Sequence, residues 1–180
     1  MEGELRDGLE FWGLERKLCL AVGCGETLER REVERAVALK SFDYRVLNLL
    51  LYEMEGQAVN EQHFEFLKAS ELLVEISDDL FDYEDDVLSN TFNVYRMFLA
   101  MYGPTQGQLE LAHWISDIER RYEQLLSGLE ASLSKNYRER CKNAAKEGGS
   151  TADSNSPMGS WTLPPPISNE GAYREEMREG

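Results

Sequence analysis

The residues in this chain whose types and spacing could do chemistry are the aspartates that recur between Asp78 and Asp86. Asp78, Asp82 and Asp86 follow one another at intervals of four residues, and Asp79 stands beside the first of them. Side chains four residues apart lie on the same face of an α-helix, so these carboxylates would point in one direction. Mg²⁺ takes oxygen ligands of this kind, commonly one or two carboxylates together with phosphate oxygens. The spacing therefore predicts a Mg²⁺ site at Asp78, Asp79, Asp82 and Asp86.

The predicted helix around these aspartates is apolar over most of its circumference and acidic along one narrow stripe. At about 100° per residue, Glu71 and Glu75 fall on the same face as the aspartates, and no Lys or Arg occurs between Lys68 and Arg96. Like charges four residues apart destabilise a helix by about 0.2–0.5 kcal/mol per pair. A bound divalent cation would remove that repulsion. The alternative is a solvated acidic face that holds no ligand.

Helical periodicity governs the chain up to about residue 143, and strand patterns are nearly absent. Asn60 is the expected N-cap of the helix that carries the aspartates, and Thr105 with Gln108 fits a capping box at the start of a later helix. Breaks are expected at 23–25, 56, 89–91 and 103–104. We therefore expect an all-α fold, an antiparallel bundle of at least five helices, with helical stretches over 5–22, 29–55, 60–88, 92–102 and 105–133.

The composition changes at Lys146, and from there Gly, Ser, Asn and Pro dominate. Such a segment buries too little apolar surface to offset the entropy of ordering, and the three prolines at 164–166 favour an extended polyproline conformation. Two alternatives follow: a disordered tail, which the composition favours, or a tail that Trp161 and Leu163 dock onto the bundle or a partner. We therefore divide the chain into a helical bundle domain, 1–145, and a disordered Gly/Ser/Pro-rich tail, 146–180.

The overall charge and hydropathy exclude several classes of partner. The 180 residues carry a formal net charge of −15, which argues against binding nucleic acid through phosphates and against a polybasic membrane anchor. No apolar run approaches the roughly 18–20 residues that a membrane span needs, and the acidic N-terminus does not fit a signal or transit peptide. Cys19, Cys24 and Cys141 form no C-x-x-C pair, as expected of reduced thiols. We expect a cytoplasmic protein, unless truncation removed a targeting segment.

The acidic segment also resembles a known motif. The residues from Asp78 to Asp82, DDLFD, resemble the DDxxD motif of class I isoprenoid synthases, and with the flank up to Asp86 they resemble the second Asp-rich motif of trans-prenyltransferases. The same stretch is similar to the second metal motif of terpene cyclases, where Asn93 lies near an Asn that often follows. Lys40 precedes a Ser at about the distance where prenyltransferases carry a Lys-Thr or Lys-Ser pair. The resemblance covers roughly residues 28–135.

What the resemblance implies is a helical bundle in which Mg²⁺ ions hold an isoprenyl diphosphate, with lyase or transferase activity on allylic diphosphates where the site is complete. The candidate diphosphate contacts are Lys40, Arg45, Asn93 and Arg96. The alternative for Lys40 and Arg45 is a solvated or ion-paired side chain, and the alternative for Arg96 is a salt bridge to Glu84, Asp85 or Asp86. The first Asp-rich motif of the family, which lies upstream of the second, has no counterpart in this sequence. The chain therefore resembles the C-terminal half of such a domain, a truncated isoprenoid-synthase-type bundle.

Two hypotheses about function remain open at the level of the sequence. The first is an isoprenoid-synthase-like protein, active or once active, that binds Mg²⁺ and an isoprenyl diphosphate. The missing first motif leaves open whether the chain is active alone. The second is a non-catalytic helical protein-interaction module that retains the fold. A half-bundle should expose apolar surface, so we also expect a homo-oligomer or a partner helix that covers it.

Overall fold

Helices make up all the regular structure in the residues that the structure, a computed structural model, describes: 2–147 and 161–179. This confirms the all-α class. No helix in those two ranges is long and apolar enough to cross a membrane. The elements are α1 (Glu2–Cys24), α2 (Arg30–Lys40), α3 (Phe42–Met54), α4 (Glu61–Phe81), α5 (Tyr83–Ser89), α6 (Val94–Gly128), α7 (Ala131–Glu147) and α8 (Glu170–Glu179).

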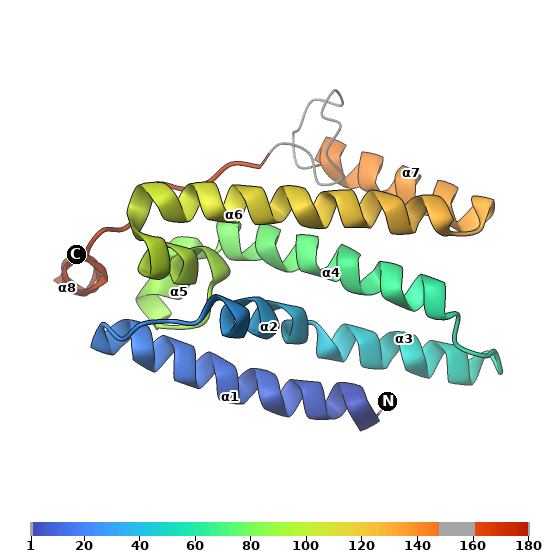
Figure 1. Cartoon of the computed structure of the whole chain (residues 1–180), viewed down its shortest axis with the longest axis horizontal. Helices are drawn as coiled ribbons and strands as arrows, with labels where there is room; N and C mark the ends of the chain where they lie inside the picture. Colours follow the sequence, from blue (N-terminus) through green and yellow to red (C-terminus); the bar gives the residue numbers. More distant parts are fainter. Residues whose placement is uncertain (1, 148–160, 180) are drawn as a thin grey trace.

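The long helices lie side by side in the order α1, α2 with α3, α4 and α6 (Figure 1). Helix α4 packs mainly on α6, and α2 contacts α1, α4 and α6. Helix α3 packs mainly on α1. The core is built chiefly from the apolar faces of α2, α4 and α6, where Val33, Leu73 and Leu111 are completely buried. This arrangement leaves one side of α3 without a neighbouring helix in the described part of the chain.

Three helices that the periodicity predicts as continuous are broken in the structure. The stretch 105–133 is divided where α6 ends at Gly128 and α7 begins at Ala131. The stretch 29–55 is divided at Ser41, whose backbone has φ −84° and ψ 28° and whose hydroxyl donates to the carboxylate of Glu75. The stretch 60–88 is divided at Asp82, where φ is −90° and ψ is 9°. Helix α5 therefore leaves the axis of α4, and Asp86 no longer continues the row of carboxylates on α4.

The backbone signals in the sequence located most of the other helix ends. The Asn60 side chain caps α4 by accepting from the amide of His63 at 3.1 Å. Gly103, at φ 78° and ψ 171°, interrupts α6, where the sequence predicts a break. The capping box predicted at Thr105 is wrong, because Pro104 already lies inside the helix that follows. The Gln108 side chain instead donates to the hydroxyl of Tyr95 at 2.8 Å.

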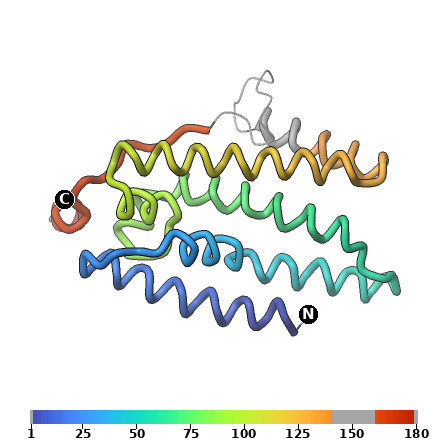
Figure 2. The backbone as a smooth tube through the Cα atoms, in the orientation of Figure 1, coloured from blue at the N-terminus to red at the C-terminus, as the bar shows by residue number. Residues whose placement is uncertain are grey.

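Residues 161–179 lie against the bundle, as the tube in Figure 2 shows. Trp161 Nε1 donates to Glu119 at 2.8 Å, and the amide of Ile167 donates to the hydroxyl of Tyr83 at 3.0 Å. Leu163 and Tyr173 pack against the core, and α8 contacts α5. Residues 161–179 are therefore docked on the bundle and not disordered as the composition predicts. The reason is that a few large apolar side chains in this segment pack against the core. The remaining tail residues, 148–160, lie outside the described ranges.

Candidate functional site

Three carboxylates of the acidic stripe on α4 point to the junction between α2 and α3. Lys40 is the last residue of α2, and its Nζ lies 3.0 Å from Oε2 of Glu75 and 2.6 Å from Oδ1 of Asp79. One turn earlier on α4, Glu71 is buried and meets Arg45 of α3. The stripe is therefore paired with cations from elements that precede it in the chain.

Arg45 is the only buried residue of α3, and it joins three helices. Its Nε lies 2.5 Å from Oε2 of Glu4 on α1, and its Nη1 lies 2.7 Å from Oε2 of Glu71 on α4. The other oxygen of Glu71, Oε1, is buried and has no hydrogen-bond partner among the described residues. Burial raises the pKa of Glu71 to about 7, despite the opposing effect of the Arg45 guanidinium.

Asp79 is the most deeply buried carboxylate of the stripe, with 2% of its surface exposed. Its Oδ2 accepts from the amide of Val94 at 2.6 Å, and its backbone carbonyl accepts from Nδ2 of Asn93 at 2.5 Å. Burial raises the pKa of Asp79 to about 6, while Lys40 and the amide of Val94 act in the opposite direction. Burial alone would lower the pKa of Lys40, but Asp79 and Glu75 raise it above its ordinary value. At neutral pH this is a charged, hydrogen-bonded pair that ties α2 to α4 and α6.

The other three predicted metal ligands lie in different surroundings. Asp78 and Asp82 are exposed, and the pKa of Asp78 is raised, first by partial burial and then by the charge of Glu75. Asp86 accepts from Nδ2 of Asn93 at 2.9 Å and from the hydroxyl of Thr91 at 2.7 Å. No group of three or more acidic, His or Cys side chains in the described ranges is arranged to hold a metal ion. A metal-ligand role for Asp78, Asp79, Asp82 and Asp86 stays a prediction.

Arg96, a predicted diphosphate contact, lies almost completely inside the protein, with 1% of its surface exposed. Its Nε and Nη2 bind the two carboxylate oxygens of Glu170 on α8 at 2.7 and 2.8 Å. Its remaining donors bind the carbonyl of Thr91 at 2.8 Å and Oδ1 of Asn90 at 2.7 Å. Arg96 therefore forms an ion pair, but the predicted partners Glu84, Asp85 and Asp86 are wrong. Its partner is Glu170, which no local sequence pattern indicates.

All four predicted diphosphate contacts thus bind other groups of the chain, and Arg45, Asn93 and Arg96 are buried. Lys40 and Arg45 pair with α4, and Asn93 bridges Asp79 and Asp86 while its Oδ1 caps α6 by accepting from the amide of Arg96 at 3.1 Å. Sequence reasoning missed Glu4 and Glu170, which complete the coordination of the two buried guanidinium groups. Both lie in the first turns of their helices, where acidic residues are common for reasons of helix polarity alone.

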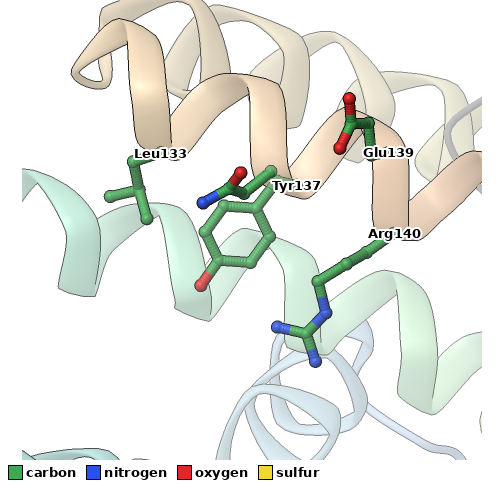
Figure 3. Close-up of a pocket in the computed structure, with 5 residues that line it drawn as sticks. Leu133, Tyr137, Glu139 and Arg140 are labelled. Atoms are coloured by element: carbon green, nitrogen blue, oxygen red, sulfur yellow. The ribbon is translucent and has the colours of Figure 1, made fainter.

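A second group of polar side chains joins α3, α4 and α7. The hydroxyl of Tyr52 lies 2.7 Å from Nδ1 of His63, and the hydroxyl of Tyr137 lies 2.8 Å from its Nε2. Burial lowers the pKa of His63 and raises that of Tyr137 to about 12. An open pocket of about 420 Å³ adjoins Tyr137 and Arg140 (Figure 3), and the described residues that line it belong to α7.

Lowering the pH from 7.5 to 5.5 should stabilise the protein. Because the folded-state pKa values of Glu71 and Asp79 lie above their ordinary values of 4.5 and 3.8, the folded state binds protons that the unfolded state has released. The stabilisation that these two carboxyl groups contribute has its full value below their ordinary pKa values. It is lost as the pH rises through their folded-state pKa values of about 6 to 7. We expect a gain of roughly 1–3 kcal/mol, measured by urea unfolding at both pH values.

The variant Glu71→Gln separates the contribution of Glu71 to the pH dependence of stability from the contributions of Asp79 and His63. His63 acts in the opposite sense, because a lowered His pKa favours the folded state as the pH rises. Glu71→Gln should reduce the gain at pH 5.5 and leave the contribution of His63 in place. Stability that falls steadily between pH 7.5 and 5.5 would contradict the assignment of two carboxylates held above their ordinary pKa.

Comparisons of the chain with models of protein families, with curated proteins and with solved structures gave no match.

Proposed function

We propose that this chain is a non-catalytic helical protein-interaction module. The observation that carries the proposal is helix α3, most of whose thirteen residues are apolar although only Arg45 is buried. A helix with that composition is normally buried on most of its sides. The exposed apolar side chains of α3 therefore point to a surface that another protein covers.

The exposed side chains of α3 continue onto α1. Met54 is 82% exposed and Leu47 is 57% exposed on α3, and Leu9 is 65% exposed on α1. We call this surface the α1–α3 face. Its members are large apolar side chains with more than a third of their surface exposed: Leu5, Leu9, Trp12, Tyr44, Leu47, Leu50, Leu51 and Met54. Contiguous apolar surface of this size on a protein marks an interaction site more often than chance exposure.

The chemistry of the acidic stripe supports the same proposal. Carboxylates that are to bind a metal ion and a diphosphate must be accessible, whereas Glu71 and Asp79 are buried and bound to cations of the chain itself. Buried pairs of this kind fix the register between neighbouring elements. In this proposal the stripe holds α2 and α3 against α4 and so positions the α1–α3 face.

Leu47→Glu combined with Leu51→Glu should remove the interaction without unfolding the protein. Both side chains are more than half exposed, so the double change should alter the melting temperature by only a few degrees. Leu67→Glu, at a buried position of α4, is the contrasting control and should unfold the chain. Cross-linking in an extract of the source cells should yield a product with the wild type that the double variant lacks. Identical products from both proteins would refute the proposal.

A second candidate function is the binding of Mg²⁺ and an isoprenyl diphosphate, which the exposure of Asp78 and Asp82 favours. These carboxylates lie one turn apart beside Glu75, and mutual repulsion contributes to the raised pKa of Asp78. Mg²⁺ with diphosphate should then raise the melting temperature by mass action. Asp82→Asn should abolish most of that rise, whereas Asp85→Asn, at an exposed neighbour, should retain it. Calorimetry without heat of binding at about millimolar ligand, a range where even weak sites bind, would exclude this function.

A further inference from the structure

We propose that the α1–α3 face pairs with the same face of a second copy of this chain, forming a two-fold symmetric dimer. The inference rests on the proposed interaction function and names the partner of that surface. Three features carry it: the two helices present their apolar side chains on one side, the exposed area suits a stable interface, and the charges at the two ends of the face are opposite.

The exposed side chains of α1 and α3 lie on a common side of the molecule. Arg45 points to α4, and at about 100° per residue Leu47 and Met54 fall on the opposite side of α3. On α1, Leu9 lies opposite the buried Phe11 by the same geometry. The ring of Trp12 contacts that of Phe42 edge to face at 5.9 Å, so the two exposed sets adjoin.

The area of the face matches what a stable dimer needs. Its eight side chains are between 39% and 82% exposed. Taking the roughly 200 Å² of an aromatic side chain as an upper bound for each of the eight, the exposed apolar surface is at most on the order of 900 Å². A standard protein interface buries about 800 Å² per partner. One copy of this face therefore provides enough surface to cover the other.

The charges at the ends of the face are complementary across a two-fold axis. Helix α1 runs antiparallel to α3, because Glu4 pairs with Arg45 while Gly8 lies against Phe42. A helix rises about 1.5 Å per residue. Measured along the helix axes from the Glu4–Arg45 pair, Arg16 therefore lies about 18 Å away in one direction and Glu55 about 15 Å away in the opposite direction. An axis at that level brings Arg16 of each copy to the Glu55 end of the other.

These end charges are available for such contacts. Arg16, Glu53 and Glu55 are exposed, and none has an ion pair with a described residue. Asp43 lies near the proposed axis, and its repulsion across the axis opposes pairing together with the net charge of −15. We therefore expect a dissociation constant of roughly micromolar size, which corresponds to about −8 kcal/mol.

Analytical ultracentrifugation of the full chain tests the proposal. The 20.6 kDa protein should sediment as a dimer at about 100 times the expected dissociation constant and dissociate on dilution. Leu47→Glu with Leu51→Glu should remain monomeric at every concentration. Leu109→Glu, at a comparably exposed leucine on α6 outside the face, should dimerise like the wild type.

A charge exchange tests the two-fold geometry itself. Arg16→Glu should weaken the dimer at least tenfold, and Glu53→Arg with Glu55→Arg should weaken it similarly. The three changes together should restore dimerisation, because the pairs reform with reversed signs. Weakening without restoration would overturn the two-fold arrangement.

The outcomes also separate this inference from the proposed function. A monomer at the highest concentration, or a dimer that survives Leu47→Glu with Leu51→Glu, would overturn the inference. If the monomer nevertheless yields a cross-linked product in the source extract that the double variant lacks, the face binds a different protein and the proposed interaction function stands. If the chain neither dimerises nor yields a cross-linked product that the double variant lacks, both the dimer and the proposed interaction function are refuted.

Discussion

Replacing Arg96 with alanine should lower the free energy of unfolding by about 3–5 kcal/mol, the cost of breaking a buried ion pair from one side. The guanidinium is almost fully buried and donates to Glu170, Asn90 and the carbonyl of Thr91. Alanine would leave the carbonyl of Thr91 without this donor and Glu170 with Arg174 as its remaining cation, in a space that water fills poorly. Urea unfolding followed by circular dichroism measures the loss, and a value below about 1 kcal/mol would contradict the central role of Arg96.

Two further variants show which property of the Arg96 side chain stabilises the fold. Arg96→Lys retains the positive charge but loses the planar fork that binds both oxygens of Glu170. It should therefore lose a large part of the same free energy. Arg174→Ala is the matched control, because Arg174 also pairs with Glu170 but keeps a fifth of its side chain exposed. Its loss should stay near 1 kcal/mol, as for pairs that water screens.

Replacing Lys40 with methionine should cost a similar 3–5 kcal/mol at neutral pH, because it leaves the Asp79 carboxylate buried without its cation. Methionine preserves most of the aliphatic volume, so the effect reports on charge. Without Lys40 the pKa of Asp79 rises further above its present value of about 6. The carboxyl then takes up a proton as the pH falls, and the loss should shrink between pH 7.5 and 5.

A double-mutant cycle isolates the Lys40–Asp79 pair. Asp79→Asn alone leaves Lys40 with Glu75 as its remaining partner, so its loss should be smaller than that of Lys40→Met. The combination of both changes should recover much of the stability lost in Lys40→Met, because no buried charge is then unpaired. Strictly additive losses that do not vary with pH would show that the two side chains do not interact as the distance of 2.6 Å implies.

Local backbone chemistry in the sequence predicted much of the fold. Asn60 caps α4 and Asn90 adopts the left-handed conformation at the end of α5, as the side-chain chemistry of Asn favours. The sequence does not predict the breaks at Ser41 and Asp82 or the break between α6 and α7. Ser and Asp also occur inside helices, and at Ser41 a hydrogen bond that its hydroxyl donates to Glu75 of another helix accompanies the break.

The surroundings of the acidic stripe could not be predicted from its own spacing. The periodicity placed Glu71, Glu75 and Asp79 on one face, but it contains no information about which element lies opposite. The cations that lie opposite precede Glu71 by 26 residues and Asp79 by 39 residues. The composition of residues 146–180 favours a disordered tail over docking through Trp161. An average composition gives little weight to one large side chain, although that side chain can decide whether the segment docks.

The Arg96–Glu170 pair has a consequence for the synthesis of the protein. Glu170 follows Arg96 by 74 residues, so at about 5–20 residues per second a ribosome adds it roughly 4–15 s later. During that interval the nascent helices α4, α5 and α6 can associate, but the guanidinium at their centre lacks its carboxylate. Tyr83 also lacks its contact with Ile167. We expect the unfinished chain to be a substrate for chaperones until α8 leaves the exit tunnel and closes the fold.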